Sequence, residues 1–447
     1  MNKDRRLLDR IGGDKVVWLI ILLLMMISLV GLSSATSSMA NSQITRFDII
    51  WEQMKTIGMG VIAIVFCVFC VSIKLFRKFA SLGFVFSFIV LLFLVLHLTP
   101  SKSFCAAPIN GAWRIIKVGN IQIHILEVVK VAMVMYLAWA VDKYKNGRFL
   151  LQEKLATLPH LEWLDTPMAK KIVNIYGPMV IVCALALPAG TSNAVFIGVI
   201  LFLTLAIAGM PFKDMSGMLL IGLTAAGIIV GIHKASDGKF IPRLATALSN
   251  SRDMDAQIDS LRSSTPGSTK YNNALDLIRQ PYGAKMAIAN GGLSGKGPGK
   301  STMKYVVPVI YEDYMFSFLV EEYGILIGGI IIFALYIAML ARGAIIARNC
   351  DDLFSKVTVG GLSALIAGQA TMHIMVNCDV GLQTGQTLPL ISYGTSAFVC
   401  FSIAFGVILS ISRSAQARVQ KEMERSESLM TATGEEIVDT ADNIIQL

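Results

Sequence analysis

Residues 311–341 read YEDYMFSFLVEEYGILIGGIIIFALYIAMLA, and this stretch decides the class of fold that the chain can adopt. The part from 314 to 341 is apolar and long enough to cross the roughly 30 Å hydrocarbon core of a bilayer as one helix. Acidic side chains interrupt the stretch at 312–313 and again at 321–322. Carboxylates at or inside a membrane boundary are costly, so we expect each pair to have a structural or functional reason.

The composition extends this interpretation to the whole chain. Of its 447 residues, 54% are hydrophobic and only 15% are charged, which is typical of a protein built from membrane-spanning segments. We therefore predict an all-α, polytopic membrane protein with ten transmembrane helices. The predicted spans are 16–35, 56–73, 80–98, 123–141, 172–188, 192–209, 215–233, 314–341, 357–377 and 388–412.

Basic residues predict the orientation of these spans. Lys and Arg gather before the first span and in alternate connecting segments, whereas the short segments 189–191 and 378–387 contain none. The positive-inside rule therefore places both termini in the cytoplasm and the loop 235–312 outside, since loops longer than about 60 residues translocate regardless of charge. We expect one membrane domain over 1–412 and a partly disordered cytoplasmic tail over 413–447. The net charge of +9 is spread over the loops, which indicates contact with anionic lipid and not with nucleic acid.

Two basic side chains near predicted outer helix ends could bind an anion. Arg114, which follows Trp113, has the planar donor geometry that clamps a phosphate, although an arginine beside an aromatic residue is more often an interface anchor. Lys130 follows Glu127 by three residues, so both side chains share one helix face. Either they form a buried ion pair that holds the helix in place, or Lys130 faces a cavity and meets a pyrophosphate. The sequence leaves both alternatives open.

A glycine-rich run and the two acidic pairs complete the candidate residues. The run GGLSGKGPG at 291–299 lets backbone amides approach an anion and carries Lys296, but it is also typical of a flexible re-entrant turn. Asp313 lies about 12 Å above Glu321 along one helix at about 1.5 Å per residue, so we expect it to be the surface-accessible acid. A carboxylate at a low-dielectric boundary has a raised pKa, which suits a general base, whereas the structural alternative for Asp313 is helix N-capping. For Glu321 and Glu322 we expect hydrogen bonds to neighbouring helices.

Together these segments resemble the signatures of one family, the SEDS proteins (shape, elongation, division and sporulation), typified by FtsW and RodA. The resemblance covers most of the chain in the family's order and is greatest to the division-type FtsW. The chain departs from the family pattern at His124 and Ile125, where the family has glutamine and proline, at 187–191, which lacks the family's aspartate, and at Thr395, where the family has glycine. The segments that carry the resemblance are 110–115, 124–130, 291–299, 311–324 and 384–396.

The resemblance implies ten helices, a large external loop and an enzyme that polymerises lipid II into glycan strands. It places Asp313 at the family's catalytic aspartate, where it would deprotonate the 4-hydroxyl of an acceptor N-acetylglucosamine. That oxygen would attack the donor N-acetylmuramic acid and displace undecaprenyl diphosphate with inversion, while Arg114 and Lys130 offset the growing charge. A divalent cation could share this role, but the sequence shows no dedicated site. The residues predicted to bind substrate are Arg114, Glu127, Lys130, Lys296, Ser392 and Tyr393, with Glu312, Glu321, Glu322, Gly291, Gly292 and Pro389 in supporting roles.

The same resemblance implies a class B penicillin-binding protein, which is a transpeptidase, as partner, together with other divisome or elongasome membrane proteins. It also implies location in the bacterial inner membrane. Two other functions stay open from the residues alone: a lipid II flippase, whose intramembrane acids would couple to protons, and a scaffold that only recruits the transpeptidase. Within the polymerase hypothesis, general likeness favours septal synthesis and leaves an elongation-type, RodA-like role as the alternative.

Overall fold

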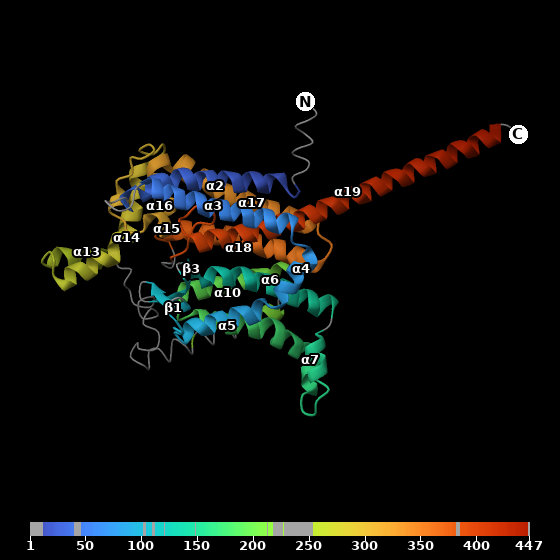
Figure 1. Cartoon of the computed structure of the whole chain (residues 1–447), viewed down its shortest axis with the longest axis horizontal. Coiled ribbons are helices and arrows are strands. Elements are labelled where there is room, and N and C mark those ends of the chain that lie inside the picture. The colour runs from blue at the N-terminus through green and yellow to red at the C-terminus, as the bar shows by residue number, and fades with distance from the viewer. Residues whose placement is uncertain are drawn as a thin grey trace.

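The chain folds as a bundle of long apolar helices that run side by side (Figure 1). The computed structural model describes residues 12–39, 46–101, 104–109, 112–119, 121–147, 149–211, 213–217, 227, 254–380 and 385–445. Within this part of the chain, six helices are long and apolar enough to cross a membrane, or seven if the bent pair 73–81 and 83–95 crosses as one span. These helices are Lys15–Ala35, Phe47–Phe69, Pro167–Ala186, Met315–Arg348, Leu353–Asn377 and Thr395–Glu424.

Most predicted spans coincide with a helix of the bundle. Two further predicted spans correspond to α6 (Ile125–Asn146), which carries charged residues, and to the shorter apolar helix α10 (Thr191–Ile207). The predicted span 215–233 lies largely outside the described residues. The total of ten spans, and the side of the membrane on which each end lies, therefore stay predictions. The other helices are α2 (Lys15–Ala35), η1 (Thr36–Met39), α3 (Arg46–Phe69), α4 (Ile73–Ser81), α5 (Gly83–Val95), α7 (Leu150–Leu155), η2 (Glu162–Asp165), α8 (Pro167–Lys171), η3 (Ile172–Tyr176), α9 (Gly177–Ala186), α13 (Met254–Ser263), α14 (Thr269–Gly291), η4 (Met303–Tyr305), α15 (Ile310–Asp313), α16 (Met315–Gly324), η5 (Ile325–Ile331), α17 (Ile332–Arg348), α18 (Leu353–Asn377) and α19 (Thr395–Ile445).

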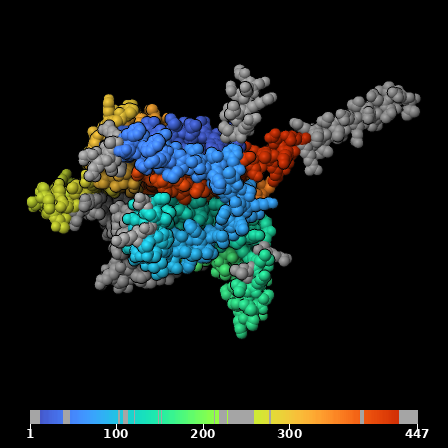
Figure 2. Space-filling model, in the orientation of Figure 1, coloured from blue at the N-terminus to red at the C-terminus, as the bar shows by residue number. Residues whose placement is uncertain are grey.

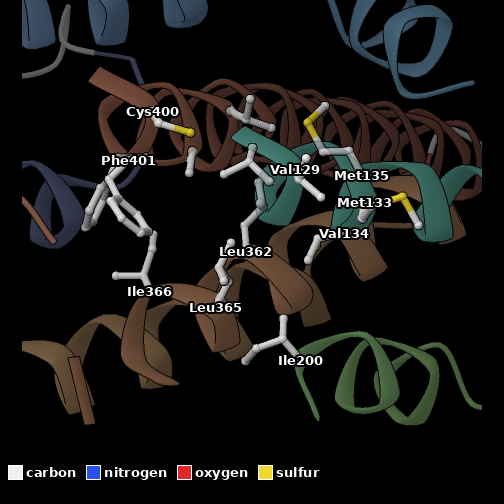
Figure 3. Packing of buried hydrophobic residues seen from close by; sticks show 14 of the residues in the cluster. Val129, Met133, Val134, Met135, Ile200, Leu362, Leu365, Ile366, Cys400 and Phe401 are labelled. Atoms are coloured by element: carbon white, nitrogen blue, oxygen red, sulfur yellow. The ribbon is translucent and has the colours of Figure 1, made fainter. Parts of the chain in front are cut away.

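The core of the bundle lies where α6, α10, α18 and α19 meet (Figure 3). Aliphatic and aromatic side chains from these helices interdigitate there, among them Val129, Leu362 and Phe401, each at most 1% exposed. Small residues let neighbouring helices approach closely, as is usual for membrane helices. At Gly406 of α19, an added Cβ would lie only 2.7 Å from the Cβ of Cys67 on α3. This contact fixes α3 against α19.

A small antiparallel sheet covers one end of the bundle, and the prediction of an all-α chain missed it. Its strands β1 (Phe104–Ile109), β2 (Ala112–Val118) and β3 (Ile121–His124) pair in the order β1-β2-β3, with a bulge between Ala107 and Pro108. The prediction had residues 104–122 as a loop between two spans and 123–124 as the start of a helix. Its strands are short and their apolar residues pack on helix ends, so periodicity alone does not reveal them. The last strand leads directly into α6 and so fixes the sheet to the core.

The remaining short elements gather at opposite ends of the bundle (Figure 1). The sheet, α13, α14 and α15 lie at one end, so the described part of the predicted loop 235–312 is largely helical. At the other end lie α4, α7 and the last part of α19, which continues along the predicted tail to Ile445. The segment around α7 projects sideways from the bundle (Figures 1 and 2). The end that carries the sheet and α15 contains the acidic pair at 312–313.

Candidate active site

Asp313 lies at a break between two helices. The one-turn helix α15 ends at Asp313, Tyr314 leaves the helical region (φ −126°, ψ 26°), and α16 begins at the next residue. Neither Val309 nor Tyr314, the N-cap residues of the two helices, makes a side-chain capping bond. The carboxylate of Asp313 therefore does not serve as the cap of α16. Val309 has a φ of 56°, which is strained for a β-branched residue, and such strain tends to occur at functional sites.

Arg114 and Gly385 meet Asp313 from two other parts of the fold. Arg114 lies on β2, and Gly385 lies in the segment that precedes α19. A Cβ added at Gly385 would stand 3.1 Å from Asp313 Oδ2 and 3.4 Å from Arg114 Nη1. Both charged groups therefore reach the same point against the bare backbone of Gly385. Segments more than 70 residues apart in sequence thus form one small site, as the resemblance implied for Arg114 and Asp313.

The electrostatic environment of this site suits proton transfer. Burial raises the pKa of Asp313 to about 6, and the nearby Arg114 guanidinium opposes that rise. Burial, with the charge of Asp313 as a second cause, raises the pKa of Glu312 to about 7. Both carboxyls therefore hold their protons to a higher pH than free side chains do. A carboxylate whose pKa lies just below the working pH can accept a proton and release it again.

Glu127 and Lys130 form a buried ion pair in α6 rather than an open cation. Lys130 is 1% exposed, and its ammonium donates to Glu127 Oε1 at 2.8 Å, Gln369 Oε1 at 2.6 Å and Gln386 Oε1 at 2.9 Å. These three acceptors use all three of its protons. Gln369 also donates to Glu127 Oε2 at 3.2 Å, and Gln386 donates to Asn193 of α10. The geometry favours the ion-pair alternative that the sequence left open.

Polar residues of α18 connect this buried network to Asp313. The backbone carbonyl of Gln386 accepts from His373 Nδ1 at 2.6 Å, and His373 Nε2 accepts from the amide of Phe316 at 3.3 Å. Asn377, one turn further along α18, donates to the carbonyl oxygen of Asp313 at 3.1 Å. Gly385 and Asp313, on opposite sides of the site, are therefore held by one helix.

Sequence reasoning missed these α18 residues, although a signal for them existed. Gln369, His373 and Asn377 recur every four residues within a predicted span, which places them on one face of the helix. Polar side chains at membrane depth that share a face indicate an internal network. This four-residue periodicity is the signal, since His373 has no second histidine at a metal-binding spacing.

The glycine-rich run at 291–299 packs on α16 and does not present its amides to open space. The amides of Lys296 and Gly297 donate to the carbonyls of Glu321 and Glu322, each at 2.9 Å. An added Cβ at Gly291 would stand 2.1 Å from the carbonyl oxygen of Val320. The glycines therefore allow this segment to pack closely against α16. The α-helix ends at 324–325, where its last carbonyls have no hydrogen-bond donor within the helix. Gly292 accepts from the amide of Ile325 at 2.9 Å and belongs to the same contact.

Glu321 and Glu322 are fully buried and hold this run in place. Glu321 accepts from Lys296 Nζ at 2.8 Å and from the Ser301 hydroxyl, the Thr302 hydroxyl and the amides of Thr302 and Met303. Glu322 accepts from the Ser34 hydroxyl of α2 at 2.6 Å and lies 3.8 Å from Lys304 Nζ. The acids bind the loop as well as a helix, whereas the prediction named helices alone. The ammonium of Lys296 also donates to Thr302 Oγ1 at 2.8 Å, so the geometry gives it a structural role.

Pro389, Ser392 and Tyr393 shape the segment that carries Gly385. The carbonyl of Pro389 accepts from the Tyr336 hydroxyl at 2.6 Å, and the Ser392 hydroxyl accepts from the amide of Leu388 at 2.9 Å. The amide of Tyr393 donates to the carbonyl of Tyr311 at 2.9 Å, and the two rings meet edge to face. This segment is thereby tied to α15, two residues before Asp313.

The described residues offer no group of three or more His, Cys, Asp or Glu side chains that could hold a metal ion. Asp313 lies next to Arg114, Glu312 precedes it in the chain, and burial raises the pKa of both carboxyls. A contribution from a divalent cation at this site stays a prediction.

The chain is similar to known proteins over most of its length. The FtsW/RodA/SpoVE model of cell cycle proteins matches residues 14–417. Stage V sporulation protein E of Bacillus subtilis (strain 168) is 29% identical over 402 residues, covering 90% of this chain and 97% of that protein. The probable peptidoglycan glycosyltransferase FtsW of Lactococcus lactis is 23% identical over 382 residues, covering 82% of this chain and 84% of that protein. A chain of a solved peptidoglycan synthase complex, described as coordinating polymerization and crosslinking, has a TM-score of 0.60 at 20% identity and covers 90% of this chain and 98% of its own length.

The family model spans nearly the whole bundle, and the chain belongs to the FtsW/RodA/SpoVE family. It is therefore a peptidoglycan glycosyltransferase and a multi-pass membrane protein. The likeness to the solved complex, at 20% identity, concerns the fold alone. The resemblance to this family inferred from the sequence is confirmed.

Proposed function

We propose that this chain polymerises lipid II into glycan strands at the outer face of the cytoplasmic membrane, with Asp313 as the catalytic base. The observation that carries the proposal is the meeting of Asp313 and Arg114 against the bare backbone of Gly385. The carboxylate can deprotonate a hydroxyl nucleophile, and the guanidinium can stabilise a diphosphate leaving group. The bare backbone of Gly385 lets both groups approach one point. The predicted orientation, which places 235–312 and α15 outside, supports the proposal.

The reaction is a single displacement. Ionised Asp313 takes the proton from the 4-hydroxyl of the acceptor N-acetylglucosamine, and that oxygen forms a bond to the anomeric carbon of the donor N-acetylmuramic acid. The bond to the diphosphate oxygen breaks, undecaprenyl diphosphate leaves with the electron pair, and the α-linkage becomes β. A diphosphate is a stable anion, so one base suffices. Arg114 stabilises the charge that grows on the leaving diphosphate.

The buried Glu127–Lys130 pair supports this chemistry from a distance. Its ammonium has three protein acceptors and holds Gln386, the residue next to Gly385. We therefore assign the pair to positioning of the 385–393 segment, together with Pro389, Ser392 and Tyr393. Direct contact of Lys130 or Lys296 with the diphosphate would require these ammonium groups to give up their present partners.

The partner that fits this function is a class B penicillin-binding protein, which would cross-link the strands that this chain makes. The solved complex with a similar fold is described as coordinating polymerization and crosslinking, which supports such a pairing here. Other divisome or elongasome membrane proteins would join the same assembly. The location proposed for all of them is the bacterial inner membrane.

The flippase alternative depends on intramembrane acids that exchange protons during transport. Glu321 and Glu322 are the acids in question, and each is fully buried and bonded to the 296–304 segment or to α2. Acids held by several donors are poor proton carriers, because protonation would break those contacts. We therefore favour the polymerase.

The test is strand synthesis from lipid II by the purified full-length chain together with its transpeptidase. Asp313→Asn keeps the size of the side chain and removes the base, so we expect a loss of polymer of about 10²- to 10⁴-fold. Asp259→Asn, on the exposed helix α13, is the matched control and is expected to retain full activity. Polymer from Asp313→Asn at the wild-type rate would contradict the proposal, and lipid translocation without polymer in the wild type would favour the flippase.

The septal role is proposed on general likeness to FtsW, with elongation as the alternative. Depletion of the chain in its host distinguishes the two. Filaments are expected from failed septation, and rounded cells would instead assign the chain to elongation.

A further inference from the structure

The start of α16 lacks a cap from its own sequence neighbours. An α-helix leaves its first amides without partners inside the helix, and these must be bonded elsewhere when buried. Tyr314, the N-cap residue, provides no side-chain bond. The amides of Phe316 and Ser317 are buried, and both donate to side chains of α18 instead. The cap of α16 is therefore supplied by another helix.

We propose that His373 and Asn377 of α18 are positioning residues that cap α16 and thereby hold Asp313 and Gly385 at catalytic distance. The inference rests on the proposed role of Asp313 as base. It concerns two residues that lie outside the signatures by which the sequence resembled its family.

Asn377 binds both sides of the break between α15 and α16. Its Oδ1 accepts from the amide of Ser317 at 2.9 Å and from the Ser317 hydroxyl at 2.8 Å. Its Nδ2 donates to the carbonyl oxygen of Asp313 at 3.1 Å and to that of His373 at 2.8 Å. The side chain is fully buried. Asn377 thus fixes the backbone from which the carboxylate of Asp313 projects.

His373 binds the two sides of the site with its two ring nitrogens. Because the amide of Phe316 can only donate, Nε2 of His373 must accept and carries no proton. The ring is then the tautomer with its proton on Nδ1, which donates to the carbonyl of Gln386 at 2.6 Å. One nitrogen holds the helix that follows Asp313, and the other holds the residue that follows Gly385.

The two bonds of the His373 ring fix the spacing between the base and the backbone opposite it. Gly385 leaves little spare room, since an added Cβ would already stand 3.1 Å from the carboxylate. Loss of either bond would let one side of the site shift relative to the other. Misplacement by about 1 Å in an active site can cost about 10²-fold in rate without removing any catalytic group.

Replacing His373 by asparagine or by glutamine tests the two hydrogen bonds of the ring one at a time. In His373→Asn the side-chain nitrogen can take the place of Nδ1 and keep the bond to Gln386, while the bond to Phe316 is lost. In His373→Gln the longer side chain reaches the place of Nε2, so its oxygen can accept from Phe316 while the bond to Gln386 is lost. Asn377→Ala removes the bond to the Asp313 carbonyl, and Thr371→Ala, on the same helix but outside this contact, is the control.

The measurement is kcat and KM for lipid II in the reconstituted full-length complex, with the melting temperature of each variant. We expect kcat to fall about 10- to 100-fold in Asn377→Ala and in both His373 variants, with KM within about twofold. The variants that keep one bond are expected to keep more activity than His373→Ala. Thr371→Ala is expected to retain the wild-type kcat.

Two outcomes separate failure of this inference from failure of the proposed function. If Asp313→Asn is inactive while folded His373→Asn, His373→Gln and Asn377→Ala keep the wild-type kcat, the positioning role is overturned and the base assignment stands. If Asp313→Asn itself polymerises normally, the proposed function fails before α18 is considered. Should Asn377→Ala not fold, the two His373 variants decide the question, because each retains one half of the contact.

Discussion

Two acidic pairs lie at opposite ends of α16, and they have opposite environments. Glu321 and Glu322 accept hydrogen bonds from hydroxyls, amides and Lys296, which fix the 296–303 segment and α2 against the helix. Glu312 and Asp313 are half-buried, burial raises the pKa of both, and in the described part of the chain the charge that opposes this rise at Asp313 is Arg114. The difference shows that the type of residue does not distinguish a structural acid from a catalytic one. The number of donors around each carboxylate does.

The largest expected effect is a loss of stability in Glu321→Ala. Removing one partner of a buried ion pair leaves the other charge unpaired, so we expect unfolding to become easier by about 3 kcal/mol. The measurement is the melting temperature of the full-length chain in detergent or nanodiscs. Asp313→Asn serves as the opposite case, because it removes a poorly compensated carboxylate and should melt at or above the wild-type temperature. If Asp313→Asn were the less stable of the two variants, the assignment of the pairs would have to be reversed.

An intermediate effect is expected from alanine at one glycine of each region. In Gly291→Ala the new Cβ would stand 2.1 Å from the carbonyl oxygen of Val320, so backbone must move and the melting temperature should fall. In Gly385→Ala the nearest atoms are the ends of the Asp313 and Arg114 side chains, which can shift without unfolding anything. We expect Gly385→Ala to melt normally and to lose about tenfold in kcat. Equal effects of the two substitutions on both stability and rate would contradict a packing role for Gly291 and an active-site role for Gly385.

The smallest effect is on the pH dependence. Since burial raises the pKa of Asp313 to about 6, kcat/KM should fall as the pH drops through that value and the base becomes protonated. The guanidinium of Arg114 lowers the same pKa, so Arg114→Gln should move this acidic limb to higher pH by about 1 unit, while Arg114→Lys should move it less. An unchanged limb in Arg114→Gln would contradict the contact between these two groups.

The same raised pKa has a consequence for stability. The folded state binds the proton of Asp313 more tightly than the unfolded chain does, so the contribution of Asp313 is favourable below its ordinary pKa of 3.8 and is lost as the pH rises through about 6. In Asp313→Asn this part of the pH dependence of the melting temperature should disappear. The catalytic need for an ionised carboxylate is therefore met at some expense of stability.

The sequence predicted the helical bundle well because a bilayer imposes its own rule. Long apolar runs must form helices, since no water is present to satisfy the backbone. The run at 314–341 indicated a span, and it corresponds to the helices from Met315 to Arg348. The acidic residue that lies at the centre of the site, Asp313, also stood out in the sequence because of its place at the end of that run. Arg114 was predicted from its donor chemistry and from the resemblance, but its strand was not.

The sequence alone determined which segments are apolar, which residues carry charge and where the chain resembles its family, since these depend only on local composition and order. Only the tertiary structure decided that Lys130 donates hydrogen bonds to Gln369 and Gln386. It also decided that the glycine-rich run packs on α16. The same holds for His373 and Asn377 of α18, which cap the helix beside Asp313. The physical reason is that these contacts join residues from 25 to more than 200 positions apart. Which donor meets which acceptor at such separations is fixed by the packing of whole helices, and no local pattern encodes it.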